Sequence, residues 1–387
     1  MREVVGIICE YNPFHKGHLY QIEEIKKELP NAKIVAIMSG NIVQRGEFAI
    51  IDKRKRAELA LENGVDLVLE MPYPYCGATA EVFASAGVRI ATQIGCTHLY
   101  FGTENSDLSL LEKIAEEIET EEVKKLISEK LSISKSYNEA KEKALLDRGL
   151  QLPKSPNDIL GLEYIRAIKN QNSSIKYCTI KRKGAGYNDQ GIADIMSASA
   201  IRKYFYEHLE FSSIPECTQV LYKNIVREKQ VLDVIAMNDF FHRFALTVGR
   251  EEIDDAYDSC AEIGAIIKNS AENSKNGEEF ISQLSSRAFT TSRIKRALLF
   301  TLFKVKSADK CPNFANLLGM NVNGKEIIKQ AKNDNFKIVT KHSDAKTLDP
   351  VSKINYDITI LVDKFYYTLL KSSINPSQAY NQKPIIK

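Results

Sequence analysis

The chain has 387 residues, 44% of them hydrophobic and 27% charged, with a formal net charge of +3. This composition indicates a globular protein with more than one domain, and no apolar run approaches the roughly 18 residues of a membrane span. The apolar run at 4–9 is also too short for a signal peptide. We therefore expect a cytoplasmic protein with no membrane partner, and the small net charge does not by itself indicate a nucleic-acid partner.

The first half of the chain alternates short β-rich runs with helical patterns. Strands are predicted at 4–8, 34–37, 65–69, 98–101 and 175–180, and helices near 17–28, 53–63 and 79–94. This alternation is typical of a parallel sheet covered by helices on both faces. Asp52 is expected to cap the second helix, so the KRKR run at 53–56 is predicted to form its solvated first turns, with a phosphate or nucleic-acid role as the alternative.

Charged, Leu/Ile-spaced sequence from about 105 to 170 predicts a helical insertion between the fourth and fifth strands. After about 215 the alternation stops, and helices are expected near 218–232, 251–270, 277–287 and 292–306, with a strand at 357–362. The polar tail 372–387 is expected to be partly disordered. The sequence thus predicts an α/β catalytic domain over 1–215, including the insertion, and a mostly helical C-terminal domain over 216–387.

Seven cysteines are scattered singly, without a CxxC pair. This spacing indicates reduced thiols rather than disulfides or a zinc site. No protein metal site is therefore expected.

The first strand leads into the segment GIICEYNPFHKGHLY at 6–20, with two histidines around a glycine where the next helix begins. Open parallel sheets bind ligands beyond the carboxyl ends of their strands, and the amino end of a helix attracts phosphate. Gly17 lets a ligand approach the backbone closely. His15 and His18 can then donate hydrogen bonds to charge that grows on a triphosphate during displacement. Two surface histidines at a helix start are the alternative, which the position after the first strand disfavours.

A strand followed by HxGH resembles the nucleotidyltransferase superfamily, which implies a Rossmann-like parallel-sheet domain. Six segments in chain order extend the resemblance to the bacterial tRNA(Met) cytidine acetate ligase family: EYNPFHKGH at 10–18, SGNIVQRGEFAIIDK at 39–53, DLVLEMP at 66–72, YFGTEN at 100–105, SPNDILGLEY at 155–164 and SASAIR at 197–202. That family implies an ATP-dependent enzyme that converts acetate to acetyl-adenylate, releasing pyrophosphate. It then acetylates the wobble cytidine of elongator tRNA(Met), releasing AMP, and Mg²⁺ is expected to accompany ATP.

The resemblance also implies roles for individual residues, with His15 and His18 as the catalytic pair. The implied ATP-binding residues are Ile7, Ile8, Cys9, Glu10, Tyr11, Asn12, Pro13, Phe14, His15, Lys16, Gly17, His18, Leu19, Tyr20, Gly102, Asn157 and Arg182. Phosphate-binding candidates are Ser197, Ser199 and Arg202. Simpler alternatives are a helix cap for Ser197, an ordinary first-turn residue for Asn157 and a solvent-facing cluster around Arg182. Glu10, Asn12 and Gln44 are polar candidates beside the acetate pocket, without assigned contacts.

Two basic segments need separate interpretation. KLSISKS at 130–136 is similar to the KMSKS loop of class I synthetases but falls inside the predicted insertion, so a solvated helix junction is expected there. TTSRIKRALLFTLFKVK at 290–306 predicts a helix with Ile294, Ala297 and Leu298 inward. Its exposed face would carry the tRNA-binding candidates Arg293, Lys295 and Arg296, with ordinary solvation as the alternative.

Two other functions remain open at this point. HxGH and SASAIR would equally serve a coenzyme-forming adenylyltransferase, although the large helical C-terminal part disfavours it. A noncatalytic ATP- or tRNA-binding protein is the other alternative, disfavoured by the intact histidine pair. The sequence makes no prediction of oligomeric state.

Overall fold

The computed structural model describes residues 3–104, 107–134, 137–182, 195–308, 311–331, 336–372 and 374–387. Its centre is a sheet in which β1 (Val4–Cys9), β2 (Lys33–Ser39), β5 (Leu67–Met71), β6 (His98–Thr103) and β7 (Lys176–Lys181) run parallel, in the order β5-β2-β1-β6-β7. All the strands predicted in the first 180 residues are confirmed. The chain order reverses between β1 and β6, which places the expected ligand crevice at their carboxyl ends.

Strand β2 shows why both faces of the sheet are buried. Ile34, Ala36 and Met38 pack into one apolar cluster, whereas Val35 and Ile37 pack into a second cluster on the opposite face. Alternate side chains of a strand point to opposite faces, so an unbroken apolar run implies cover on both sides. The first cluster is completed by helices α1 (Lys16–Glu28) and α2 (Lys53–Glu62), and the second by α3 (Ala80–Gln93).

Helix α2 corrects one prediction about charge. Asp52 caps the helix as expected, accepting a hydrogen bond from the Arg54 backbone N–H at 2.8 Å. Lys53 and Arg56, however, are not solvated, since only 2% and 0% of their surface is exposed. Lys53 meets Glu70 and Asp363, and Arg56 donates to backbone carbonyls. The prediction of a solvated KRKR turn is therefore wrong at these two positions.

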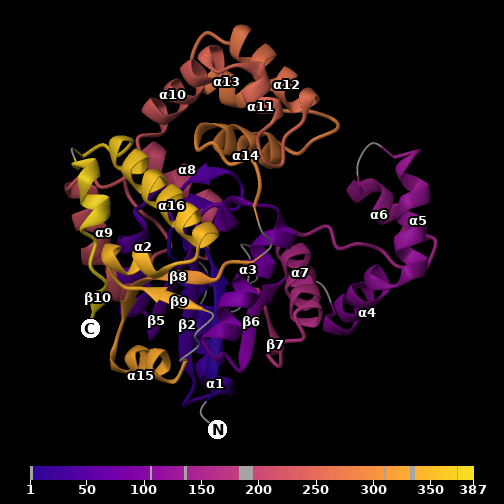
Figure 1. The fold of residues 1–387 in the computed structure, drawn as a ribbon. Helices are drawn as coiled ribbons and strands as arrows, with labels where there is room; N and C mark the ends of the chain where they lie inside the picture. Colours follow the sequence, from indigo (N-terminus) through magenta and orange to yellow (C-terminus); the bar gives the residue numbers. More distant parts are fainter. Residues whose placement is uncertain are drawn as a thin grey trace.

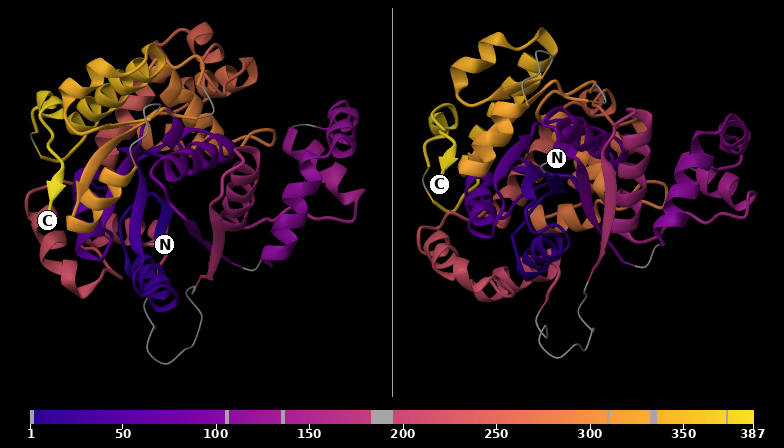
Figure 2. Two further views of the ribbon diagram at one scale, coloured as in Figure 1. Left: turned by 60° about the horizontal axis from the view of Figure 1, so that its bottom comes forward. Right: turned by 90° about the horizontal axis from the view of Figure 1, so that it is seen from below.

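The predicted helical insertion is confirmed between β6 and β7. It contains α4 (Leu108–Glu119), α5 (Glu121–Leu131), α6 (Tyr137–Leu146) and α7 (Pro156–Asn170). Helix α7 packs against α3, whereas α5 and α6 project away from the body (Figures 1 and 2). KLSISKS begins at the end of α5, as expected for a helix junction, but its Lys135 and Ser136 lie outside the described residues, as does Asn105 of the segment YFGTEN.

Beyond β7 the chain is mostly helical, as predicted, up to residue 302. The helices are α8 (Ala198–His208), α9 (Gln219–Arg227), α10 (Val234–Thr247), α11 (Arg250–Asp254), α12 (Ala261–Glu272), α13 (Gly277–Gln283) and α14 (Thr291–Leu302). The sequence analysis missed α10 and joined α11 to α12. We call residues 234–302 the helical group. It lies at the end of the sheet opposite the N terminus, with α14 nearest the sheet (Figure 1).

The last part of the chain returns to the sheet, which the sequence analysis did not foresee. Strand β8 (Phe314–Met320) pairs antiparallel with β5, and β9 (Lys337–Val339) and β10 (Ile385–Ile386) pair parallel with β8. Helix α15 (Val322–Gln330) lies between β8 and β9. The sheet contains strands from both sides of residue 215. The predicted domain boundary at 215 therefore does not separate the sheet from the C-terminal residues.

Two predictions for the C-terminal residues are wrong. Residues 357–362 form no strand but lie within helix α16 (Pro350–Thr368), whose cap Asp349 accepts from the Ser352 N–H at 3.0 Å. The tail is ordered where it is described, with a 3₁₀ turn, η4 (Pro376–Tyr380), and β10. The remaining short elements are β3 (Ile42–Val43), β4 (Glu47–Phe48), η1 (Tyr75–Gly77), η2 (Glu216–Thr218) and η3 (His342–Thr347). No described helix is both long and apolar enough to span a membrane.

Candidate active site

The bend between β1 and α1 places both histidines at the carboxyl end of the central strand. His15 is the N-cap residue of α1, and His18 lies one turn further on. Asn12 fixes the preceding loop, since its Oδ1 accepts a hydrogen bond from the Ile50 backbone N–H at 2.9 Å. The amino end of α1 therefore lies beyond the carboxyl end of β1, at the crevice predicted at the switch point.

Hydrogen bonds to the backbone determine which ring nitrogens carry protons. Nδ1 of His15 accepts from the Gly17 N–H at 3.0 Å, and Nδ1 of His18 accepts from the His15 N–H at 3.3 Å. An imidazole whose Nδ1 accepts must carry its proton on Nε2 when it is neutral. The rings stack with centroids 3.8 Å apart and planes inclined by 25°, and neither Nε2–H group has an acceptor among the described residues.

Burial favours the neutral form of both imidazoles. Burial lowers the pKa of His15 to about 3, with a further contribution from the Arg182 guanidinium. Burial lowers the pKa of His18 well below its usual value, helped by the charges of His15 and Arg182. The pair therefore offers hydrogen-bond donors that need no deprotonation, rather than two positive charges.

The SASAIR segment lies beside this bend, as its predicted phosphate role requires. Ser197 caps α8, with its Oγ 3.2 Å from the Ala200 N and 3.1 Å from the Ser199 Oγ. Arg202 donates from NH1 to the Asn12 carbonyl at 2.7 Å. The amino ends of α1 and α8 are close together, since a Cβ added at Gly17 would lie 3.3 Å from the Ile195 side chain.

Three predicted ATP contacts meet on the other side of β1. Arg182 donates from NH1 to the Asn157 Oδ1 at 3.2 Å, and a Cβ on Gly102 would lie only 2.9 Å from the Arg182 Cγ. Asn157 in turn donates to the Glu104 Oε1 at 2.6 Å. Because the charge of Arg182 lowers the pKa of both histidines, these residues belong to the same site as the HxGH bend.

The predicted ATP-binding run 7–20 divides into core and accessible residues. Ile7, Tyr11 and Phe14 are buried in the apolar core, so only their backbone can approach a ligand. Accessible residues from the first two turns of α1 line a pocket of about 360 Å³ together with one residue that precedes α8 and with residues at the start of η2. That lining consists of Lys16, Leu19, Tyr20, Glu23, Ile195, Pro215, Glu216 and Cys217.

Two of the three polar candidates for the acetate pocket, Glu10 and Gln44, are joined by a hydrogen bond, whereas the Asn12 side chain accepts from Ile50 instead. The half-buried Glu10 carboxylate accepts from the Gln44 N–H at 2.9 Å, and the Gln44 side chain donates to the Ala78 carbonyl at 3.1 Å. Burial raises the pKa of Glu10, against the opposing effect of the Gln44 hydrogen bond and the charges of Arg202, Arg45 and Arg56. This carboxyl is thus held at the end of β1 within a cluster of arginines.

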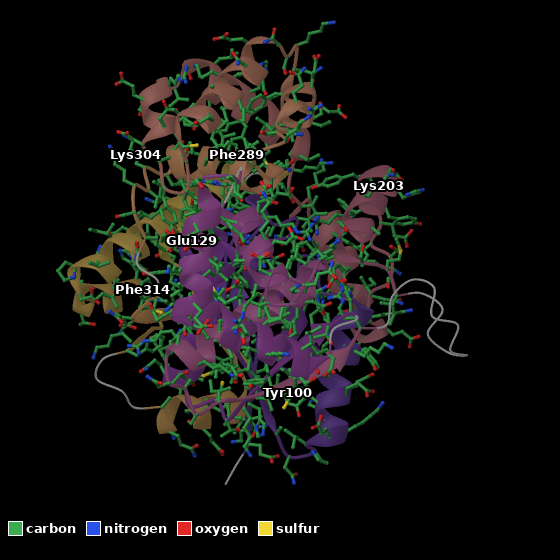
Figure 3. All side chains as sticks on the ribbon, turned by 90° about the vertical axis from the view of Figure 1, so that its right-hand side faces the viewer. Tyr100, Glu129, Lys203, Phe289, Lys304 and Phe314 are labelled. Carbon is green, nitrogen blue, oxygen red and sulfur yellow. The ribbon has the colours of Figure 1, made fainter. Side chains whose placement is uncertain are left out.

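Helix α14 corrects the expectation of an exposed basic face. Ile294, Ala297 and Leu298 point inward as predicted, but Arg296 is buried and pairs with Asp258 at 2.7 Å. Arg293 also pairs with Asp258, at 3.0 Å, and lies over the Phe289 ring, where the helical group meets the body (Figure 3). Lys295 pairs with Glu47 at 2.7 Å.

Sequence reasoning missed Arg56 and Glu47 as residues that support the site. Arg56 donates to the carbonyls of Glu10 and Ser39 at 2.5 and 3.2 Å and to that of Gly40, so it braces two strand ends at once. Glu47 lies between Lys295 and Arg202. The polar segment QRGE at 44–47 could have indicated a functional loop. Its sequence does not distinguish the side chains that contact the protein from those that face solvent. Among the described residues no group of three or more His, Cys, Asp or Glu side chains could hold a metal ion.

Comparison with known proteins agrees with this geometry. Residues 2–382 match the family described as HIGH Nucleotidyl Transferase. The tRNA(Met) cytidine acetate ligase of Acetivibrio thermocellus is 34% identical over 99% of this chain and 100% of its own, and that of Caldanaerobacter subterraneus subsp. tengcongensis is 35% identical over 100% of both. The crystal structure of Thermotoga maritima TmcAL bound with alpha-thio ATP superposes with a TM-score of 0.89, at 29% identity and with 99% of each chain covered. The chain therefore belongs to the HIGH nucleotidyl transferase family and, within it, to the tRNA(Met) cytidine acetate ligases.

Proposed function

We propose that this protein activates acetate with ATP and transfers the acetyl group to the wobble cytidine of elongator tRNA(Met). The observation that carries the proposal is the stacked imidazole pair, His15 and His18, whose Nε2–H groups have no acceptor among the described residues at the amino end of α1. Their neighbours Arg182 and Ser197 add further donors for phosphate. The substrates named for the relatives, and the ATP analogue of the Thermotoga maritima protein, support the same assignment.

In the first step an acetate oxygen attacks the α-phosphorus of ATP, and the bond to the pyrophosphate oxygen breaks. Negative charge grows on the leaving pyrophosphate, and the two Nε2–H groups and Arg182 stabilise it without covalent chemistry. In the second step the exocyclic amine of cytidine attacks the acetyl carbonyl, AMP leaves, and the amine loses a proton. A mixed anhydride makes acetate an effective acyl donor, which explains the need for ATP.

The described residues contain no group of three or more His, Cys, Asp or Glu side chains that could hold a metal ion, and Mg²⁺ in nucleotide sites is bound largely by phosphate oxygens and water. We propose that Mg²⁺ enters with ATP and is held by triphosphate oxygens and water. A tRNA substrate also implies that the protein works in the cytoplasm.

The test is ATP–pyrophosphate exchange measured with and without acetate, followed by addition of elongator tRNA(Met) and detection of acetylcytidine by mass spectrometry. We expect exchange that depends on acetate, and acetylcytidine at the wobble position. Exchange supported instead by a phosphorylated small molecule would indicate a coenzyme-forming adenylyltransferase. Absence of exchange with bound ATP would indicate a noncatalytic binding protein.

A further inference from the structure

The β3–β4 hairpin projects a single arginine from a sharply defined turn. Ile42 pairs with Phe48 and Val43 with Glu47, which leaves a three-residue loop, 44–46. The Gly46 N–H donates to the Val43 carbonyl at 3.0 Å, and Gly46 has φ +73°. A tight turn closed by a left-handed residue is a common hairpin geometry and favours glycine at that position. Arg45 occupies the centre of the loop and is exposed.

Every other residue of this hairpin is held by burial, by hydrogen bonds, by an ion pair or by close packing against α14. Ile42, Val43 and Phe48 are buried in the core. Gln44 is held by Glu10 and by the Ala78 carbonyl, and Glu47 is held by Lys295. Gly46 lies so close to α14 that an added Cβ would be 2.7 Å from the Arg296 backbone N. The Arg45 backbone is therefore fixed from both sides, which lowers the entropy cost of using its side chain for binding.

Several arginines near the bend already donate hydrogen bonds or form ion pairs within the protein. Arg56 donates to backbone carbonyls, Arg202 to the Asn12 carbonyl, and Arg182 to Asn157. On α14, Arg293 and Arg296 share Asp258. Within the described part of the chain, Arg45 forms neither an ion pair nor a side-chain hydrogen bond. Its guanidinium is thus carried on a fixed backbone and is exposed to a ligand.

The position of Arg45 relates it to the reacting atoms. Its neighbour Gln44 contacts Glu10, the residue that follows β1, and the hairpin lies between the HxGH bend and α14 of the helical group. Its charge opposes the rise in the pKa of Glu10 and helps to lower the pKa of Glu47. In the proposed reaction the acetyl group is formed at the end of β1. An RNA nucleotide that reaches this group brings its flanking phosphates close to the 44–46 loop, which carries Arg45.

We propose that Arg45 binds a backbone phosphate of the acceptor RNA beside the nucleotide that is acetylated. This inference rests on the proposed function, since that function supplies an RNA acceptor. The planar guanidinium fork matches phosphate oxygens with two parallel hydrogen bonds. A phosphate contact positions the RNA without reading its sequence, so Arg45 serves binding and alignment of the RNA rather than activation of acetate.

The experiment compares the parent protein with Arg45→Ala, Arg45→Lys and the control Arg227→Ala. Arg227 is also an exposed arginine, with a side chain 74% exposed and only a 3.9 Å contact to Glu228. Binding of elongator tRNA(Met) is measured at several salt concentrations, and acetate-dependent ATP–pyrophosphate exchange is measured separately. Thermal unfolding verifies that each variant is folded.

For Arg45→Ala we expect a rise of about tenfold in the Kd for tRNA. The slope of log Kd against the logarithm of the salt concentration should also be smaller by about one, since one phosphate contact is lost. Arg45→Lys should fall between the parent and Arg45→Ala, and Arg227→Ala should bind like the parent. The KM for ATP in exchange should stay at the parent value in Arg45→Ala.

Two results would overturn the assignment. One is an unchanged Kd and salt dependence in Arg45→Ala, and the other is a raised KM for ATP, which would place Arg45 in the nucleotide site. Loss of the proposed function is a separate outcome, because it would show as absent acetate-dependent exchange in the parent. The tRNA-binding comparison would still decide the role of Arg45 in that case.

Discussion

Each histidine of the HxGH bend serves the helix with one nitrogen and leaves the other for a ligand. Nδ1 of His15 and of His18 accepts backbone N–H groups, so α1 begins with a reciprocal cap. The same hydrogen bonds direct both protons to Nε2. Capping and catalysis are therefore linked in these two residues, and a useful variant must separate them.

Asparagine separates the two roles, because its Oδ1 can accept the capping hydrogen bond while its shorter side chain places no N–H donor at the position of Nε2. We expect His15→Asn and His18→Asn each to retain α1 and to lower the rate of acetate-dependent exchange by about 100-fold or more. Exchange kinetics and circular dichroism check the two effects. His208→Asn, at an exposed position near the end of α8, is the control and should exchange like the parent. Exchange within a few-fold of the parent in His18→Asn would exclude its imidazole as a donor to the transition state.

Single residues were predictable where one local rule decided them. The Ser197 and Asp52 caps followed from serine or aspartate directly before a helical pattern. Arg296 was not predictable, because its burial depends on Asp258, 38 residues earlier in the chain. A basic residue on a helix surface can be solvated or paired, and helical periodicity alone does not distinguish the two cases.

At the scale of elements, the β3–β4 hairpin connects the helical group to the catalytic bend. Glu47 accepts from Lys295 of α14 at 2.7 Å, and its other oxygen lies 3.8 Å from Arg202 of α8. Arg202 reaches the Asn12 carbonyl in the bend. The charge of Lys295 is the chief influence that lowers the pKa of Glu47 against the opposing effect of burial.

A double-mutant cycle with Glu47→Gln and Lys295→Met tests this connection. Each single variant should lower the free energy of unfolding, and the double variant should lose less than the sum, with a coupling of about 1 kcal/mol. Denaturant titrations of the four proteins give the coupling. Glu58→Gln with Lys55→Met is the matched control, since that pair is 3.4 Å apart and about a third exposed, within a single helix. Additive losses in the first cycle would mean that α14 and the hairpin are not energetically connected through this pair.

Elements were predictable from the sequence where side-chain period and turn signals agreed. The alternating first half met that condition, so the parallel strands and α1 to α3 were predicted within a few residues. In residues 357–362 the signals disagree. Four β-branched residues favour a strand locally: Ile358, Thr359, Ile360 and Val362. Pro350 and the cap Asp349 start a helix eight residues earlier, and burial at Tyr356, Ile360 and Asp363 continues with helical spacing. Tertiary packing therefore overrides local propensity in α16.

At the scale of the whole molecule, the C-terminal residues complete the catalytic domain rather than follow it. Strand β8 covers the edge of β5, and α16 brings Asp363 to Lys53 at 2.5 Å. Lys53 also meets Glu70 of β5 at 2.7 Å, and all three side chains are buried. One ammonium group thus joins α2, β5 and α16. Contacts between residues about 300 positions apart leave no trace in local sequence patterns, which explains why this arrangement was not foreseen.

Loss of the Lys53 ammonium should destabilise the whole fold in a pH-dependent way. Burial raises the pKa of Asp363 to about 7, against the opposing charge of Lys53. The folded state therefore keeps a proton that the unfolded chain releases above pH 4, and stability falls as the pH rises toward 7. Lys53→Met leaves two buried carboxyls without a cation, so we expect a loss of about 3–5 kcal/mol at pH 8 and a smaller loss at pH 5. Urea titrations at both pH values measure it, with Lys55→Met, half-buried on the same helix, as the control. Equal losses at pH 5 and pH 8 would show that Lys53 acts by packing, and the charge of the triad would then not hold the C-terminal helix to the sheet.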